Sequence, residues 1–323
     1  MPSSPDLPAR PLLILMNVGS GRNDTAATQE KIEQVLKQAG RIYRLVLVKD
    51  PTRIDEIARQ TVEEAKACCG VIVATGGDGT INAVANATLG SGIPFGVLPQ
   101  ATFNYFCRTH GIPEDIVEST RALLKARVHP VQVGLVNDRV FLVNASLGLY
   151  PQLLEDREAY KRQYGRSRVV ALWSGLITLL RHHRQLRISL ERKGQTRHIR
   201  TPTLFVCNNR LQMEQIGIPL AEALEEGQLA AISLRPAGTL AMLWLAVRGA
   251  LGKLGDAENV ISFGFQRLIV KPSSLYRTHR VKVATDGEVT WLNTPLEFRV
   301  SPEPLYLLKS DPDPYVEVPL DSG

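Results

Sequence analysis

The chain of 323 residues is poor in cysteine and contains no C-x-x-C pair. Its four cysteines are Cys68, Cys69, Cys107 and Cys207. Without paired spacing they indicate neither a zinc site nor a redox pair. We expect the adjacent Cys68 and Cys69 to be buried thiols rather than a disulfide, which fits a reducing cytoplasm.

Long apolar runs are also missing. No run reaches the roughly 18 residues that a transmembrane helix needs. The N-terminal residues lack the charged region and apolar stretch of a secretory signal. We therefore expect a cytoplasmic protein that meets a membrane only at its surface.

Repeats and low-complexity tracts are absent, and the share of hydrophobic residues, 44%, is that of a globular protein. The length suits two domains. The net charge of +6 has two interpretations. It favours anionic partners such as a nucleotide, a nucleic acid or an acidic membrane, or it reflects a solvated surface slightly rich in Lys and Arg.

Strand-like and helix-like segments alternate in the first part of the chain. Residues 12–18 form a continuous apolar run, typical of a strand buried on both faces, and residues 71–74 and 95–98 form shorter ones. Apolar residues recur at helical spacing between these runs. The order predicts an α/β domain with a parallel sheet over residues 1–128.

The pattern changes near His129, where strand-like segments follow one another closely. This spacing predicts an antiparallel β-sandwich with helical insertions over residues 129–309, followed by a tail over residues 310–323. The insertions fall near residues 153–180 and 240–251. The predicted strands cover residues 131–136, 140–143, 186–190, 198–207, 229–234, 260–270, 281–284, 296–300 and 305–308.

A glycine-rich turn stands between an apolar strand and a helix, and it reads Thr75-Gly76-Gly77-Asp78-Gly79-Thr80. Glycines let a phosphate approach backbone amides closely, and the following helix N-terminus attracts anions. The turn is neither a Walker loop nor a dinucleotide fingerprint, because Asn82 stands where the third glycine belongs. The alternative is a structural turn whose glycines adopt positive φ.

Three further motifs accompany this turn. They are Asn17-Val18-Gly19-Ser20-Gly21 after the first strand, a segment from Leu98 to Arg108, and Asp286-Gly287-Glu288. Together with GGDGT, they resemble the diacylglycerol kinase catalytic-domain family over about residues 11–300. The sequence departs from the family at Ala101, Phe103 and Tyr105, and it retains Thr102 and Asn104.

The resemblance implies an ATP-dependent kinase that phosphorylates a lipid hydroxyl, with Mg²⁺ as cofactor. The phosphates would lie on residues 75–80. Either Asp286 or Asp78 would be the general base. Further nucleotide contacts would come from Asn17, Ser20, Gly21, Arg22, Thr102, Asn104, Gly287 and Glu288.

A second cation site is predicted at Glu225-Glu226-Gly227, where some bacterial members of the family carry D-D-G and hold Mg²⁺. The longer carboxylate side chains could still bind a hard cation through oxygen. The other interpretation of this stretch is a turn with solvated carboxylates.

The expected partner is a lipid substrate at a membrane surface, and we expect no nucleic acid. Residues 169–180 are mostly apolar with basic flanks, which is typical of an interfacial helix or of a core helix with charged ends. An oligomer is compatible with the sequence. Two other functions stay open: a kinase of the NAD kinase type with a soluble substrate, or a nucleotide- or lipid-binding regulator without catalysis.

Overall fold

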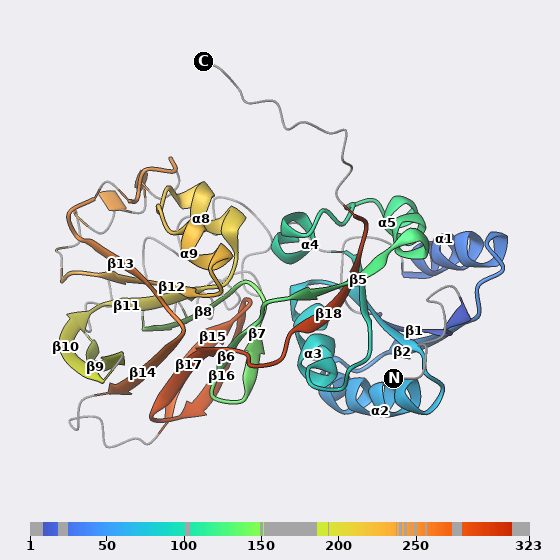
Figure 1. Ribbon diagram of the computed structural model, residues 1–323, viewed down its shortest axis with the longest axis horizontal. Helices are drawn as coiled ribbons and strands as arrows, with labels where there is room; N and C mark the ends of the chain where they lie inside the picture. The colour runs from blue at the N-terminus through green and yellow to red at the C-terminus, as the bar shows by residue number, and fades with distance from the viewer. Residues whose placement is uncertain are drawn as a thin grey trace, which may run out of the picture. The chain divides into compact units, whose positions relative to one another are not determined.

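The computed structural model describes residues 9–18, 25–100, 104–148, 151, 186–192, 194–236, 238, 241, 244–245, 247–248, 251–255, 257–272 and 280–311. The chain divides into two compact units (Figure 1). One comprises Met1–Val131 with Glu303–Gly323, and the other comprises Gln132–Pro302. The predicted helix near residues 153–180, with its apolar stretch 169–180, lies outside the described residues.

The first unit is built on a six-stranded sheet in the order β2-β1-β3-β4-β18-β5. The strands are β1 (Leu12–Asn17), β2 (Tyr43–Val48), β3 (Val71–Gly76), β4 (Phe95–Pro99), β5 (Arg127–Val131) and β18 (Leu305–Lys309). The helices are α1 (Thr25–Gln38), the short 3-10 helix η2 (Pro51–Arg53), α2 (Ile54–Ala67), α3 (Asp78–Thr88), α4 (Tyr105–Thr109) and α5 (Ile116–Lys125).

Burial on both faces explains the apolar runs of the central strands. Every residue of β3 is buried, and Ile14 and Leu15 in β1 have no exposed surface. Helix α2 buries residues at helical spacing, Ala58, Thr61, Val62 and Ala65. Strands β1 to β4 pair in parallel, which confirms the predicted α/β fold with a parallel sheet.

Strand β18 belongs to this sheet and not to the sandwich, so our prediction for residues 305–308 was wrong. It pairs in parallel with β4, at Leu307 and Phe95, and antiparallel with β5 along its whole length. A strand near the end of the chain pairs with strands about two hundred residues earlier, a partnership that no local pattern reveals.

The second unit consists of two six-stranded antiparallel sheets, in the orders β10-β9-β14-β17-β6-β7 and β13-β12-β11-β8-β15-β16. In the first of these sheets the strands are β6 (Gly134–Val136), β7 (Arg139–Phe141), β9 (Leu186–Arg192), β10 (Gln195–Thr201), β14 (Arg267–Pro272) and β17 (Leu296–Val300). In the other they are β8 (Asn144–Gly148), β11 (Thr203–Cys207), β12 (Leu229–Leu234), β13 (Val260–Phe265), β15 (Arg280–Thr285) and β16 (Glu288–Asn293).

Side chains from both sheets form one core, which includes Ile188, Leu204, Phe265 and Phe298. This arrangement confirms the antiparallel β-sandwich. Helices α8 (Arg210–Ile216) and α9 (Ala221–Glu225) pack against the second sheet through apolar residues such as Met213.

Two predicted long strands are each divided between the two sheets. Residues 198–207 contain β10 and β11, which separate at Pro202, a residue without a backbone N–H for the ladder. Residues 260–270 contain β13 and β14, which separate at Gln266. An uninterrupted strand-like pattern does not reveal where a chain passes from one sheet to the next.

Cys68 and Cys69 are exposed, so the expectation that they are buried was wrong. They end helix α2, and Cys69 has a φ of 50° in the turn toward β3. The turn lies at the surface because a sharp reversal leaves backbone groups that need water. Among the helices of the described part, none is long and apolar enough to cross a membrane.

Candidate functional site

The carboxyl ends of three neighbouring strands carry the motif residues of the first unit. Strand β1 ends at Asn17, β3 at Gly76 and β4 at Pro99, and these strands pair in parallel. The Nδ2 atom of Asn17 donates a hydrogen bond of 3.1 Å to Oγ1 of Thr80. Two motifs far apart in the sequence therefore meet at the edge where open α/β sheets place their ligands.

The glycine turn does not use left-handed backbone. Gly77 precedes α3 with a φ of −83°, Gly79 lies within the helix, and Gly76 has no positive φ. The interpretation of these glycines as a positive-φ turn is therefore wrong. A Cβ atom on Gly76 would lie 2.7 Å from the hydroxyl oxygen of Thr80, so close packing against Thr80 requires glycine at that position.

The N-terminus of α3 gives the turn its electrostatic character. The helix has 11 residues and begins at Asp78. Its first amides have no partners within the helix, and its dipole favours negative charge. The carboxylate of Asp78 occupies the first turn, so a phosphate close to it would need a cation between the two. The buried hydroxyl of Thr75 has no hydrogen-bond partner and supplies a further polar atom beside the turn.

The motif from Leu98 to Arg108 packs against the same turn. The backbone N–H of Gln100 donates to the carbonyl of Gly76 at 2.9 Å. Asn104 is buried, has a φ of 43° and precedes α4. Burial raises the pKa of the Cys107 thiol above its ordinary value, and the charge of Asp78 raises it further.

Asp286 and Gly287 form the two-residue turn of the β15–β16 hairpin, in which Thr285 pairs with Glu288. Their φ angles are 48° and 90°. Positive φ at both central positions is characteristic of the tight hairpin turns that Asp-Gly sequences favour. The Asp-Gly pair therefore forms the hairpin turn that such a sequence favours.

The carboxylate of Asp286 does more than a turn requires. It accepts hydrogen bonds from the backbone amides of Leu142 at 2.7 Å and of Val143 and Asn144 at 2.9 Å each. The Asp286 amide in turn donates to the Asn144 carbonyl. Three amide donors stabilise a negatively charged carboxylate. Asp286 therefore holds the start of β8, whatever else it does.

The anchor formed by these amides was not predicted. Backbone N–H groups look the same at every residue, so residues 142–144 carry no side-chain pattern that would have revealed it. Asn144 is a further residue that the motifs missed. Its Nδ2 donates to Gln212 at 3.1 Å, and its buried Oδ1 has no hydrogen-bond partner.

The remaining predicted residues of the second unit are exposed or engaged elsewhere. Glu288 is exposed and lies 4.0 Å from the guanidinium of Arg139. Glu225 forms an ion pair with Arg210, and Glu226 accepts from Gln228 at 3.1 Å. No group of three potential metal ligands occurs among the residues that the structure places. The cation site at Glu225 and Glu226 stays a prediction.

The family comparison agrees with this geometry. Residues 11–136 match the diacylglycerol kinase catalytic domain. This part of the chain is similar to that family. The match covers Asn17 and the glycine turn, which meet in the first unit, as well as Asn104, and it ends beyond β5.

Two curated relatives carry kinase names. A "Probable lipid kinase YegS-like" of Klebsiella pneumoniae is 36% identical over 29% of this chain and 30% of its own length. The "Diacylglycerol kinase" of Bacillus subtilis is 32% identical over 44% of this chain and 47% of its own length. The chain thus matches less than half of either relative.

The fold extends beyond the catalytic domain. A crystal structure of a diacylglycerol kinase from Bacillus anthracis has a TM-score of 0.67 and covers 96% of this chain and 98% of its own. The sequence identity is 20%, so the similarity concerns the fold alone.

Four predicted nucleotide contacts lie outside the described residues: Ser20, Gly21, Arg22 and Thr102. In the first unit the structure brings together Asn17, Thr75 and the Gly76 to Thr80 turn. In the second unit it places Asp286 and Gly287 in one hairpin turn. The roles of all these residues are predictions.

Proposed function

We propose that this chain is an ATP-dependent kinase that transfers the γ-phosphoryl group to a hydroxyl of a lipid, of the diacylglycerol type or a related one. The observation that carries the proposal is the hydrogen bond between Asn17 and Thr80 at the N-terminus of α3. The bond joins two family motifs at a helix end suited to phosphate. The catalytic-domain match over residues 11–136 supports the same function.

In the proposed reaction, the lipid hydroxyl oxygen forms a bond to the γ-phosphorus while the bond to the bridging oxygen of ADP breaks. The hydroxyl proton passes to a carboxylate. Such transfers depend mainly on positioning and charge stabilisation. The amides at the start of α3 and the turn at Gly76 would orient the phosphates.

Mg²⁺ fits the residues present. Kinases hold this ion with one or two carboxylates and the phosphates rather than with a cage of protein ligands. Asp78 supplies a carboxylate in the first turn of α3, and Thr75 adds a buried hydroxyl at the end of the preceding strand. When bound, the ion would neutralise the charge between Asp78 and the phosphates.

The proton acceptor is either Asp286 or Asp78. The three amides that bind the carboxylate of Asp286 stabilise its charge, which weakens it as a base. Asp78 has a different disadvantage, because holding a metal ion would also reduce its basicity. We favour Asp286 as the base and Asp78 as the carboxylate beside the nucleotide.

Access to a bilayer would involve residues near 240–251. Trp244 and Val247 are helical and are 61% and 47% exposed, and Leu251 is 65% exposed. The spacing of three residues places Trp244 and Val247 on one side of the helix. Leu251 lies in the turn that follows, where its amide donates to the carbonyl of Val247. Exposed apolar residues grouped in this way mark a binding surface, and the bilayer interface that holds the substrate is the partner that we propose.

The deciding experiment offers radiolabelled ATP and Mg²⁺ to the purified protein with mixed micelles of diacylglycerol, phosphatidylglycerol, a sphingoid base or ceramide, and separately with NAD. The proposal predicts label in one lipid product and none in NADP. Label in NADP alone would support the soluble-substrate alternative. Nucleotide binding without transfer to any acceptor would support the regulator.

A further inference from the structure

The β-sandwich has an open cleft at one end. Strands β10 and β13 are the edge strands of the two sheets on the same end of the second unit (Figure 1). A cleft of about 490 Å³ lies between them. Its apolar walls include Leu190, Ile199, Phe263 and Leu268, and Ile261 at its border is 37% exposed. The volume is within the range of ligand sites, about 300–1,000 Å³.

The cleft exists because cationic residues occupy core-facing positions. Alternation along β9 places Arg192 on the same face as the buried Ile188 and Leu190. On β10, Arg197 pairs with Leu190 and shares that face. In a sandwich these positions normally carry apolar residues of the core. Two arginines at the end of an otherwise apolar surface indicate a site for an anion.

Arg192 has unsatisfied hydrogen-bonding capacity. Its guanidinium stands over the Phe263 ring, 5.2 Å from the centroid. Its Nε is buried and has no hydrogen-bond partner. Leaving a buried donor on a charged group without a partner is costly, and guanidinium groups bind phosphates and carboxylates well. The unpaired Nε of Arg192 therefore indicates a ligand site rather than a structural role.

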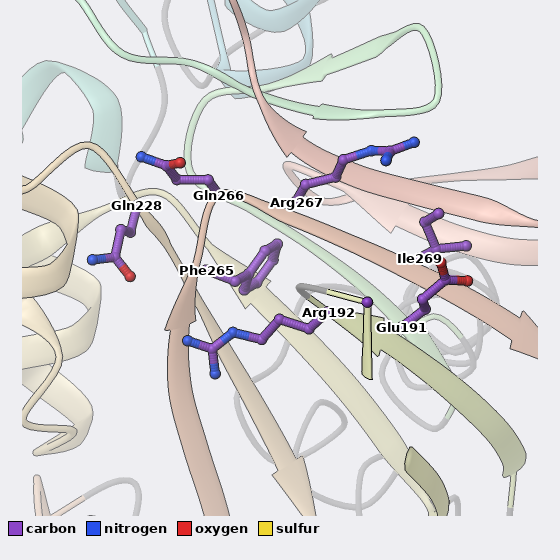
Figure 2. Close-up of a pocket in the computed structure, with 8 residues that line it drawn as sticks. Glu191, Arg192, Gln228, Phe265, Gln266, Arg267 and Ile269 are labelled. Atoms are coloured by element: carbon purple, nitrogen blue, oxygen red, sulfur yellow. The ribbon is translucent and has the colours of Figure 1, made fainter. Parts of the chain in front are cut away.

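A second hollow shares Arg192 with the cleft. Its volume is about 380 Å³, and it is lined by Arg192, Phe265, Gln266 and Gly194 among others. In Figure 2 the Arg192 side chain extends along the pocket on the side of Phe265, whereas Arg267 points away. Arg192 therefore lines both an apolar cleft and a more polar hollow. An amphiphile with one apolar chain and one anionic head fits this pair of cavities.

Few negative charges oppose such a ligand. The carboxylate of Glu191, the only one among the described lining residues of the two cavities, pairs with Lys271 at 3.0 Å. On the outer face of the same hairpin, Arg187 and Arg200 stand directly opposite each other, and both are exposed. Like charges in that position destabilise a sheet unless an anion lies nearby.

We propose that this cleft and the adjoining hollow bind one anionic phospholipid, with an acyl chain between the sheets and the phosphate on Arg192. Arg187 and Arg200 would face the anionic surface from which the lipid comes. Among the described residues that line it, the one carboxylate is already paired, so the site is distinct from the acceptor site of a kinase. A lipid held there would anchor the second unit to the membrane, and its binding does not rest on the proposed function.

Calorimetric titration without ATP tests the site, with dihexanoyl phosphatidic acid as the probe at a concentration below micelle formation. Dihexanoyl phosphatidylcholine has the same chains without the net charge, and inorganic phosphate has the charge without the chains. We expect phosphatidic acid to bind at least about tenfold more tightly than either of them, since both parts of the ligand contribute.

Two variants test the contributions of the phosphate head group and of the acyl chain separately. Arg192→Gln should weaken phosphatidic acid binding by about 10- to 100-fold, the range for a hydrogen bond to a charged group. Ile261→Gln removes part of the apolar wall at an exposed edge strand, and it should weaken binding of the lipid but not of phosphate. Arg121→Gln, an exposed arginine on α5, removes the same charge elsewhere and should change nothing.

Equal affinity for inorganic phosphate and phosphatidic acid would contradict a lipid site. So would unchanged phosphatidic acid binding in both cleft variants, each verified as folded by circular dichroism. Because the titration contains no nucleotide, a chain that proves not to be a kinase would still show this binding, and a kinase could fail to show it.

Discussion

Asn17 at the end of β1 and Thr80 in the first turn of α3 are 63 residues apart in the sequence and are joined by a hydrogen bond of 3.1 Å. The bond fixes the end of one strand to the helix that follows another. A rigid connection of this kind keeps the amides at the start of α3 in place before a nucleotide binds, which reduces the ordering cost of binding.

A double-mutant cycle on this pair should show coupling. We expect Asn17→Ala and Thr80→Val each to destabilise the fold, and the double variant to lose less than the sum by about 0.5–1.5 kcal/mol, the net value of one hydrogen bond. Urea unfolding measures the coupling. Thr80→Ser keeps the hydroxyl and should therefore retain the coupling with Asn17. Strict additivity would show that the bond contributes no stability.

Gly76→Ala should disrupt the turn. Its Cβ would lie 2.7 Å from Oγ1 of Thr80, so either the hydroxyl or the backbone must shift. We expect a loss of about 1–3 kcal/mol of stability from overpacking and at least about a tenfold loss of ATP affinity, measured by calorimetry. Gly238→Ala is the control, because its Cβ meets nothing within 4 Å. Normal ATP affinity in Gly76→Ala would contradict a phosphate site on this turn.

Asp286→Asn should affect both stability and catalysis. The amide of asparagine places an N–H group beside one of the three backbone donors, so we expect a loss of about 1–3 kcal/mol in urea unfolding. If Asp286 is the base, turnover should fall about 100- to 10,000-fold while ATP affinity changes little. Glu288→Gln removes a carboxylate from the same hairpin and should alter stability far less.

Asp78→Asn distinguishes the two aspartates. A carboxylate in the first turn of a helix contributes about 0.3–1 kcal/mol, so stability should change little. Weaker Mg²⁺-ATP binding would place Asp78 beside the nucleotide. An inactive Asp78→Asn that still binds Mg²⁺-ATP, together with a near-normal turnover rate for Asp286→Asn, would instead make Asp78 the base.

His110 should make the first unit sensitive to acid. Burial and, to a smaller extent, the positive charge of Lys309 lower the pKa of this imidazole to about 4. Its unfolded value is about 6.5, so the unfolded chain takes up a proton first as the pH falls. The contribution of the neutral His110 to the free energy of unfolding is therefore fully present above pH 6.5. It declines between about pH 6.5 and 4, by no more than about 3 kcal/mol.

The variant His110→Phe should remove this decline while keeping the edge-to-face contact with Phe106, whose ring centroid lies 4.7 Å away. Urea unfolding at a series of pH values measures it. His198→Gln is the control, since His198 is exposed on β10 and bonds to Ser189. An equal acid sensitivity in His110→Phe and in the parent protein would show that other groups cause it.

Local pattern was enough to predict the order of strands and helices in the first unit. Residues 12–16, 71–74 and 95–98 are apolar because parallel strands are covered on both faces, so the pattern and the burial have the same cause. The motif residues at the carboxyl ends of those strands follow from the same geometry. Their proximity could therefore be inferred before any contact between Asn17 and Thr80 was known.

Long-range pairing could not be inferred in this way. Strand β18 joins the first sheet through partners distant in sequence. The cleft lies between β10 and β13, which belong to different sheets and are not neighbours in the chain. The three amides on Asp286 are likewise invisible in a sequence, since every residue but proline carries the same donor. Residue types and their spacing thus determined the elements and the chemistry at their ends. Tertiary structure alone decided which strands share a sheet, because that choice depends on packing of the whole unit.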